Sequence, residues 1–384
     1  MRFEFATATR VVFGARSRLE LPTIAAALGS RALVVTGRSP SRSELLVSGL
    51  TERGVRCVLW SVPGEPTIDQ VRTGTELART NRCDLVVAIG GGSAIDAGKA
   101  IAALTTNPGD PLEYLEVIGK GRSLDRACLP FIAVPTTAGS GAEVTRNAVL
   151  ASPESGVKVS LRSPLMLPRV ALVDPELARD LPPLVTATTG LDALAQLIEP
   201  YLSHRSTPFT DPLCLDGIAR IARALPVAVR DGADVGARED MAFASLLGGM
   251  ALANAALGAV HGFAGPIGGR FPAPHGAVCA ALLSHVVRAN LVALTEREPT
   301  SPLLARFDQV GRTLTGRARA GAMDGVDRLE SLRQELHIPP LGAYGVTEAD
   351  VPTLVAQARL SSSMRGNPIE LTDSEMSDIL HRAL

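Results

Sequence analysis

Two histidines bracket a segment rich in glycine and proline, His261 to His275, in a chain with six histidines among 384 residues. Neutral imidazole is a common ligand of transition metals, and a stiff connecting loop could bring both rings to one point. A histidine in a loop can equally be a surface residue or a hydrogen-bonding partner. The segment therefore suggests a metal site that other residues must complete.

A glycine cluster, Gly90-Gly91-Gly92-Ser93, ends an apolar run at 84–90. Glycine lets the backbone turn sharply and approach a ligand, and a helix starting near Ser93 would point free N–H groups and its dipole at an anion such as a pyrophosphate. The cluster matches neither the GxGxxG fingerprint nor a P-loop. A tight strand-to-helix turn without a ligand is the alternative.

A second polar loop, PTTAGSGAEVT at 135–145, ends the apolar run 131–135. Its hydroxyls and glycines are suited to hydrogen-bonding the phosphates or amide of a nucleotide. The structural alternative is a capped loop with Ser140 as N-cap and Glu143 as its capping-box partner, and both interpretations can hold together.

Short apolar runs alternate with helical stretches in the first half of the chain, at 31–37, 57–62, 84–90, 131–135 and 170–174. This pattern predicts a parallel sheet covered by helices on both faces, with ligands bound at the carboxyl ends of the strands. Two further runs, 147–150 and 157–161, flank a polar turn and predict a hairpin added to the sheet.

Helical periodicity replaces strand-like runs after about residue 183, with helices predicted near 188–202, 211–229, 238–260, 277–294, 302–318 and 323–336. We therefore expect an α/β Rossmann-like domain at 1–183 and an all-helical domain at 184–384. The cleft between two such domains is a natural place for a small-molecule site.

Composition narrows the class of protein. Net charge is −1 with mixed signs, which argues against a nucleic-acid or anionic-membrane partner. Five scattered cysteines without a CxxC pair suggest reduced thiols and a cytoplasmic location. The N-terminus has no signal-peptide pattern, and the uncharged stretch 242–260 is rich in Ala and Gly, which favours a buried helix over a membrane span.

Six motifs in this order resemble the group III, iron-type alcohol dehydrogenases: GGGSAIDAGK, PTTAGSGAEVT, LVDPELARDLP, GLDALAQLIEPY, HGFAGPIGGRFPAPHG and GNPIELT. That family includes maleylacetate reductases, and glycerol dehydrogenase and dehydroquinate synthase are more distant relatives. The resemblance covers nearly the whole chain. It implies a dehydroquinate synthase-like architecture, a dinucleotide-binding N-terminal domain, a helical metal-binding domain, and an assembly of two or more copies.

The resemblance assigns four metal-ligand positions, and this chain departs from the pattern at one. Asp192, His261 and His275 match ligands, whereas Gln196 stands where the family has a histidine. A neutral amide is a weaker ligand than imidazole for iron or zinc, but three protein ligands suffice in many catalytic zinc sites. Metal binding by Fe or Zn and metal-free chemistry, as in the maleylacetate reductase branch, both remain open.

A family histidine that often transfers protons is Gly265 here. A bound water or a substrate group would then carry the proton. By motif position the other candidates are Lys158, Thr145, Asn147 and Ser363, the last standing where the family often has a cysteine. A hairpin lysine such as Lys158 is also commonly a solvated charge.

The resemblance implies that NAD(P) binds at the strand ends. The cofactor-binding residues would be Gly37, Arg38, Ser39, Gly90, Gly91, Gly92, Ser93, Asp96, Thr136, Thr137, Ser140 and Lys158. In many NAD-binding proteins an acidic residue follows the first strand, where it holds the ribose hydroxyls and would repel a 2′-phosphate. This chain has Gly-Arg-Ser there instead, so we expect NADP(H) to be favoured over NAD(H).

The sequence therefore predicts an NAD(P)-dependent alcohol dehydrogenase or carbonyl reductase acting on a small aldehyde, ketone or oxo acid, with metal assistance. Three alternatives remain: a metal-independent enzyme like maleylacetate reductase, a sugar-phosphate cyclase that uses NAD transiently, and a nucleotide-binding protein without catalysis.

Overall fold

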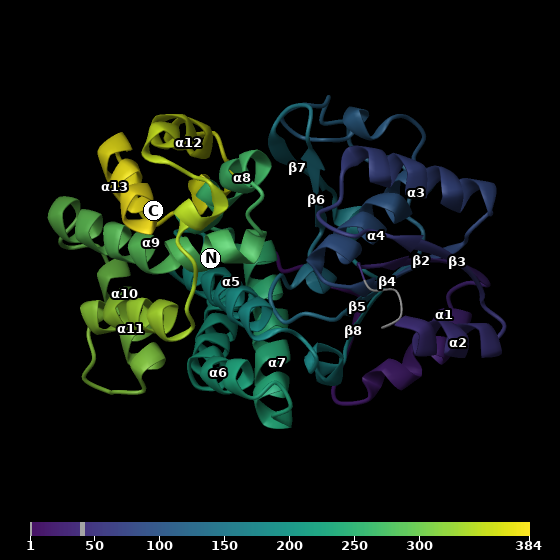
Figure 1. Ribbon diagram of the computed structural model, residues 1–384, viewed down its shortest axis with the longest axis horizontal. Helices are drawn as coiled ribbons and strands as arrows, with labels where there is room; N and C mark the ends of the chain where they lie inside the picture. The colour runs from purple at the N-terminus through teal and green to yellow at the C-terminus, as the bar shows by residue number, and fades with distance from the viewer. Residues whose placement is uncertain (1, 39–42) are drawn as a thin grey trace. The chain divides into compact units, whose positions relative to one another are not determined.

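The computed structural model describes residues 2–38 and 43–384 of the chain (Figure 1). These residues form two compact units. The α/β unit comprises Ala6–Thr137 and Gly141–Ala178, and the helical unit comprises Met1–Phe5, Ala138–Ser140 and Arg179–Leu384. All eight strands assigned in the described residues lie in the α/β unit, and the helices after residue 183 lie in the helical unit.

The α/β unit is built on a parallel sheet, as predicted. Its strand order is β1 (Arg10–Phe13), β8 (Val170–Val173), β5 (Phe131–Pro135), β4 (Leu85–Gly90), β2 (Arg31–Thr36) and β3 (Arg56–Ser61). Every residue of β4 and β5 is buried, which explains their unbroken apolar sequences. The edge strand β1 is only partly buried and lacks such a signal.

Helices cover both faces of this sheet. Alternate side chains of β2 show the two layers: Leu33 and Val35 join the core formed with α3 (Ile68–Thr80) and α4 (Gly92–Thr106). Ala32 and Val34 point into the opposite core, formed with α1 (Leu21–Ala26) and α2 (Glu44–Glu52). The carboxyl ends of the strands are thereby left to the loops.

The predicted hairpin exists as β6 (Asn147–Ser152) and β7 (Val157–Arg162), but it forms a separate two-stranded sheet. The prediction that it extends the main sheet is therefore wrong. Its buried residues, including Leu150 and Leu161, join the core on the α4 side of the sheet. The alternating pattern of the hairpin is satisfied by packing against a helix, which the sequence pattern does not distinguish from sheet extension.

A buried lysine fastens this hairpin to α4. Lys99 is 1% exposed, and its Nζ donates to Thr145 Oγ1 at 2.8 Å and to the carbonyl oxygen of Asn147. The same Nζ pairs with Asp96 Oδ1 at 3.1 Å, and Asp96 Oδ2 accepts from the backbone N–H of Val149 at 3.0 Å. The ammonium is thus compensated by a carboxylate and two neutral oxygens, as a buried charge must be.

Glu143 adds a second buried charge beside this lysine. It lies on the short helix η4 (Ala142–Val144), whose N-cap is Gly141, so the expected Ser140–Glu143 capping box is not the arrangement found. Burial raises the pKa of Glu143 to about 7, although the Lys99 charge acts in the opposite direction. Burial likewise lowers the pKa of Lys99, against the effect of Asp96.

The helical unit is organised around α5 (Pro183–Leu202), which is buried at every residue from Leu191 to Leu202. The other helices are α6 (Thr210–Arg230), α7 (Val235–Ala255), α8 (Ala259–Arg270), α9 (His275–Arg297), α10 (Leu303–Thr315), α11 (Ala322–Glu335), α12 (Val351–Arg359) and α13 (Asp373–Ala383). By length and apolarity α9 could cross a membrane, but 78% of its apolar window is buried, as in a core helix.

The single helix predicted at 238–260 is wrong, and so is the interpretation of the histidine segment as a loop. The chain breaks after α7 and resumes as α8, bent by 99°. Ala256 adopts φ 65° and ψ 178° at the break, a conformation that non-glycine residues rarely adopt. A Cβ on Gly258 would lie 2.9 Å from Glu199 Oε1, so the backbone approaches α5 closely here. His261 therefore lies in the first turn of a helix.

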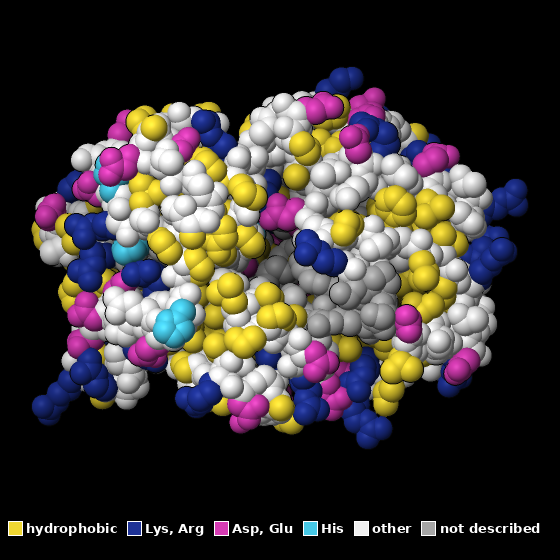
Figure 2. All heavy atoms as spheres, in the orientation of Figure 1, with side chains coloured by type: hydrophobic (Ala, Val, Ile, Leu, Met, Phe, Trp, Pro, Cys, Tyr) yellow, Lys and Arg dark blue, Asp and Glu magenta, His cyan; other side chains and the backbone are white. Residues whose placement is uncertain are grey.

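Surface charge is mixed on the face shown in Figure 2, where basic and acidic side chains are interspersed over both units. This agrees with the net charge of −1. On this face the pattern differs from the single-sign basic surface that attracts nucleic acids.

Glu143 makes a stability prediction. Because its pKa is about 7 in the fold and 4.5 ordinarily, the unfolded chain ionises first as pH rises, and stability falls between these values. The loss is up to about 3 kcal/mol. Glu143→Gln cannot ionise, so its free energy of unfolding, measured with denaturant at pH 4.5 and pH 8, should decline less than that of the wild type. The exposed Glu52→Gln is the control, and equal pH slopes in all three proteins would contradict the prediction.

Candidate functional site

Helix α5 presents three polar side chains from its buried part. Asp192, Gln196 and Glu199 are spaced by four and three residues, so they share one face. They are 3%, 3% and 5% exposed. Gln196 Nε2 donates to Asp192 Oδ2 at 3.2 Å. A polar stripe in the centre of a helical core is costly unless partners satisfy it, so the neighbouring helices must supply them.

The two histidines of the opening segment meet this stripe. His261 Nε2 lies 3.4 Å from Asp192 Oδ1, and His275 Nε2 lies 3.8 Å from the same oxygen. His275 begins α9, which approaches α5 closely: a Cβ on Gly276 would lie 3.1 Å from the carbonyl oxygen of Thr188. Three residues predicted as metal ligands are therefore brought together by three different helices.

Cys279 joins this group, and sequence reasoning missed it. Its Sγ lies 3.7 Å from His275 Nε2 and 3.9 Å from His261 Nε2. The ligand atoms of Asp192, His261, His275 and Cys279 all lie within 4.8 Å of one another. The available signal was the spacing of four residues between His275 and Cys279, which places both on one face of α9.

The atoms of this cluster fit a bound cation. Asp192 Oδ1 is buried without a hydrogen bond, although it faces two imidazole nitrogens. Buried polar atoms in native proteins nearly always have a partner, and a bound ion can be that partner. Carboxylate, imidazole and thiolate are all ligands of divalent transition metals. The donor set therefore suits such an ion.

The pKa shifts at the cluster also favour a bound cation. Burial raises the pKa of Asp192, but the charges of His275 and His261 outweigh this and the net shift is downward. Burial lowers the pKa of His261, whereas Cys279, Glu199 and Asp192 raise it well above its ordinary value. Burial and the Asp192 charge raise the pKa of Cys279 to about 12. The site thus attracts positive charge.

Two residues outside the cluster, Glu199 and Asn367, hold His261 in place. Glu199 Oε2 lies 2.6 Å from His261 Nδ1, and Glu199 Oε1 accepts from the backbone N–H of Val260 at 2.6 Å. Asn367 Oδ1 accepts from the N–H of Ala259 at 3.1 Å. In a neutral ring, the form that can bind a metal, donation of Nδ1–H to this carboxylate leaves the lone pair of Nε2 directed at the cluster. The signal for Glu199 was its position seven residues after Asp192, on the same helix face.

In the α/β unit, the ends of three neighbouring strands converge on the glycine cluster. The N–H of Thr136 donates to Gly90 O at 2.9 Å, and a Cβ on Gly90 would lie 3.3 Å from Gly37 N. A Cβ on Gly91 would lie 3.3 Å from Thr137 Oγ1. Gly90 and Gly91 are needed here for close approach rather than for a left-handed backbone, since neither is among the residues with positive φ.

Helix α4 begins at Gly92 with Gly91 as N-cap, and no side chain caps it. Its first N–H groups, from Gly92 and Ser93 onward, are therefore available to an anion, together with the positive end of the helix dipole. Arg38 lies nearby in the fold, after β2, and its Nε donates to the carbonyl oxygen of Pro63 at 3.0 Å. Ser39 lies outside the described residues.

Other predicted site residues form ion pairs or hydrogen bonds within the α/β unit. Lys158 is nearly buried and forms an ion pair with Glu65, so it is not the solvated charge considered as an alternative. Asp96, Thr145 and Asn147 belong to the Lys99 network described above. The carboxylate of Asp96, the hydroxyl of Thr145 and the main-chain oxygen of Asn147 thereby help to hold the hairpin, and the side chain of Asn147 takes no part in these bonds.

The remaining predicted residues lie in the helical unit. Ser140 belongs to a segment that packs on α5, since a Cβ on its neighbour Gly139 would lie 2.7 Å from Thr189 Cβ. Ser363 lies on the short helix η9 (Ser362–Gly366), which packs against α8: a Cβ on Gly262 would lie 2.7 Å from Met364 Cε. The open position is Gly265, where a Cβ would meet no atom within 4 Å.

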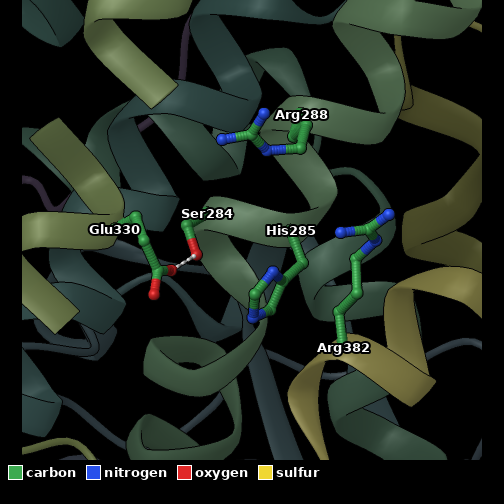
Figure 3. A pocket seen from close by; sticks show the side chains of 5 residues that line it. All are labelled: Ser284, His285, Arg288, Glu330 and Arg382. Atoms are coloured by element: carbon green, nitrogen blue, oxygen red, sulfur yellow. Dashed lines mark hydrogen bonds between the residues drawn. The ribbon is translucent and has the colours of Figure 1, made fainter. Parts of the chain in front are cut away.

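A separate hollow of about 370 Å³ lies on the helical unit (Figure 3), lined by Ser284, His285, Arg288, Glu330 and Arg382. Glu330 accepts from Ser284 Oγ at 2.9 Å and pairs with Arg333, and the Arg333 hydrogen bond lowers the pKa of Glu330 to about 2. Burial lowers the pKa of His285. None of the predicted site residues lines this hollow.

Comparison with known proteins extends over both units. Residues 8–175 match the family model described as iron-containing alcohol dehydrogenase, and residues 186–384 match that of the C-terminal part of the Fe-containing alcohol dehydrogenase family. A 1,3-propanediol dehydrogenase of Citrobacter freundii is 36% identical over 363 residues, which cover 92% of each chain.

Two solved structures show the same likeness in space. One, of a 1,3-propanediol oxidoreductase, has a TM-score of 0.92 and 33% identity, with 100% of both chains covered. The other is a sulfoacetaldehyde reductase of Bifidobacterium kashiwanohense in complex with NAD⁺, with a TM-score of 0.86, 29% identity, and 100% of this chain and 99% of that one covered.

Proposed function

The chain belongs to the iron-containing alcohol dehydrogenase family and is a nicotinamide-dependent oxidoreductase acting on CH–OH groups, and we propose that Asp192, His261 and His275 hold its divalent metal ion. The observation that carries the proposal is the buried Asp192 Oδ1, which faces both imidazoles without a hydrogen bond. Bound there, such an ion supplies a Lewis acid for the oxygen of a small alcohol, aldehyde, ketone or oxo acid.

The chain's own residues prepare this site. Glu199 fixes the orientation of His261 through Nδ1, at 2.6 Å. Burial of Asp192, Gln196 and His261 keeps bulk water from their polar atoms, which strengthens their electrostatic interactions, whereas the side chain of His275 is 40% exposed. Gln196 holds Asp192 Oδ2 at 3.2 Å, leaving Oδ1 directed at the histidines. Together they preorganise the carboxylate and the imidazoles before substrate binds.

The cofactor is a dinucleotide, and we place its pyrophosphate at the first N–H groups of α4, following Gly91. Thr136 and Thr137 follow the adjacent strand and offer hydroxyls to the same ligand. The preference for NADP(H) over NAD(H) rests on Arg38, which a bond to Pro63 holds at the strand ends and which is exposed to solvent. Its guanidinium suits a 2′-phosphate.

Relatives named as dehydrogenases and a reductase favour net hydride transfer over the cyclase and over a protein without catalysis. The metal-independent reaction of the maleylacetate reductase kind differs from our proposal in metal content. A cytoplasmic location and an assembly of two or more copies are part of the proposal. All five cysteines are free thiols in the structure, which agrees with a reducing compartment.

Metal analysis tests the central proposal. Protein purified without chelator should hold about one equivalent of zinc or iron, and His261→Ala should lose it. The variant should also lose NAD(P)H-linked aldehyde reduction by at least about 100-fold, since a Lewis acid supplies several kcal/mol. His285→Ala, on α9 outside the cluster, is the matched control and should retain both. A metal-free wild type with full activity on aldehydes or maleylacetate would overturn the metal role.

Arg38 tests the cofactor preference. Arg38→Asp removes a charge-assisted bond worth about 1.5–3 kcal/mol, so KM for NADPH should rise about 10–100-fold while KM for NADH changes little. Steady-state kinetics with both cofactors measure this. Arg53→Asp, an exposed arginine at the end of α2, controls for the change of net charge. An unchanged NADPH-to-NADH ratio in Arg38→Asp would refute the assignment.

Substitutions of Gly265 test whether this position can transfer a proton, as the family histidine at this position often does. It lies four residues after His261 on α8, and a side chain there has space. Gly265→Ala should stabilise the helix by about 0.5–1 kcal/mol without raising kcat. Gly265→His should raise kcat about 10-fold or more and add a pH dependence near pH 6.5, because a positioned imidazole can transfer the proton. If both variants show the same kcat and pH profile, the proton does not pass this position.

A further inference from the structure

We propose that Cys279 is the fourth protein ligand of the metal ion, in place of Gln196, and that its thiolate makes the site select zinc. The inference rests on the proposed metal site and adds a ligand and a metal preference to it. The full donor set would be one carboxylate, two imidazoles and one thiolate, from Asp192, His261, His275 and Cys279.

The spacing of the donor atoms supports four-fold coordination. With ligand bonds of about 2.0–2.3 Å, neighbouring donors of a tetrahedral zinc site lie about 3.3–3.7 Å apart. The two Asp192–histidine distances are 3.4 and 3.8 Å, and the two Cys279–histidine distances are 3.9 and 3.7 Å. The sulfur thus occupies the same shell as the carboxylate oxygen relative to both imidazoles.

A second observation concerns the carboxylate of Asp192 and does not depend on the cysteine. Asp192 is 3% exposed, and its Oδ1 accepts no hydrogen bond. Cys279 Sγ and both Nε2 atoms lie with this oxygen within 4.8 Å. A cation at their centre would satisfy the carboxylate oxygen, the two lone pairs and the sulfur together.

The side chain of Gln196 is engaged through its nitrogen only, and its buried Oε1 has no hydrogen-bond partner. Its Nε2 donates to Asp192 Oδ2 at 3.2 Å, the carboxylate oxygen that does not face the histidines. Its amide oxygen is neutral and is a poor ligand for a soft divalent ion. We therefore assign the fourth ligand to the softer donor, Cys279, which enters from α9 one turn after His275, and to Gln196 the positioning of Asp192 through Nε2.

The thiolate decides which metal the site prefers. A thiolate beside imidazoles in a four-ligand set is typical of zinc, whereas non-haem Fe(II) sites use two histidines and one carboxylate without sulfur. Coordination by zinc deprotonates the thiol outright. A catalytic zinc with four protein ligands must add a fifth ligand when substrate binds, which zinc accepts. We therefore expect the purified protein to contain zinc in excess of iron.

X-ray absorption of the zinc-loaded full-length protein tests the ligand directly, without an activity assay. The wild type should show one sulfur at about 2.3 Å from zinc. Cys279→Ala and Cys279→Ser should lose it, and Cys214→Ser, a buried cysteine of α6 outside the cluster, should keep it. The cobalt-loaded proteins should agree, with a near-ultraviolet sulfur-to-cobalt charge-transfer band that only the two Cys279 variants lack.

Affinity separates the roles of the two side chains. Cys279→Ala should weaken zinc binding about 100-fold or more, as measured by competition with a chelator, whereas Gln196→Ala should retain the sulfur signal with an effect of about 10-fold or less. Circular dichroism confirms that each variant is folded. Zinc bound at one equivalent with only nitrogen and oxygen neighbours would overturn the Cys279 assignment and leave the metal site standing. Failure of the wild type to bind zinc, cobalt or iron would overturn both.

Discussion

The carboxylate of Asp192 lies inside a helical core with one oxygen, Oδ1, facing two imidazole nitrogens at 3.4 and 3.8 Å and accepting no hydrogen bond. An uncompensated carboxylate at such depth costs several kcal/mol, so the unit must supply positive charge at this point. Both histidines lie in the first turn of a helix, so the break in the chain before each helix determines where the imidazole lies. The paths of α8 and α9 follow from this requirement.

Two side chains enforce the path of α8. Glu199 binds both the N–H of Val260 and His261 Nδ1, and Asn367 binds the N–H of Ala259. Asn367 also exchanges hydrogen bonds with Asn290 of α9. The first turn of α8 is thus tied to the central helix, to α9 and to the C-terminal segment. This network offsets the unfavourable conformation of Ala256 at the preceding break.

An element could be predicted from the sequence where all its residues share one environment, and less well where they do not. β4 and β5 were predicted because strands buried on both faces have continuous apolar sequences. The break at Ala256 was not, since an alanine with φ 65° carries no glycine or proline signal and the apolar pattern runs through it. The hairpin was found but assigned to the wrong partner, because alternation shows that one face is buried and not what covers it.

The candidate site shows the same limit. Motif positions led to Asp192, His261 and His275, and the structure brings them together, but Cys279 and Glu199 matter through contacts that join separate helices. Thr145 was chosen by its position after a loop, yet its hydroxyl accepts a hydrogen bond from Lys99. Sequence position alone cannot show whether a polar atom is already satisfied inside the fold.

The proposed metal-ligand cluster and Gly265, four residues after His261 on α8, differ in what they provide for the reaction. The ligand atoms of Asp192 and Cys279 are sealed from water, which favours a tightly held ion and strong polarisation of a bound oxygen. At Gly265 the helix offers no group to exchange a proton, but it leaves space. Position 265 therefore cannot relay a proton to the alkoxide, and the space there leaves room for a water that could do so.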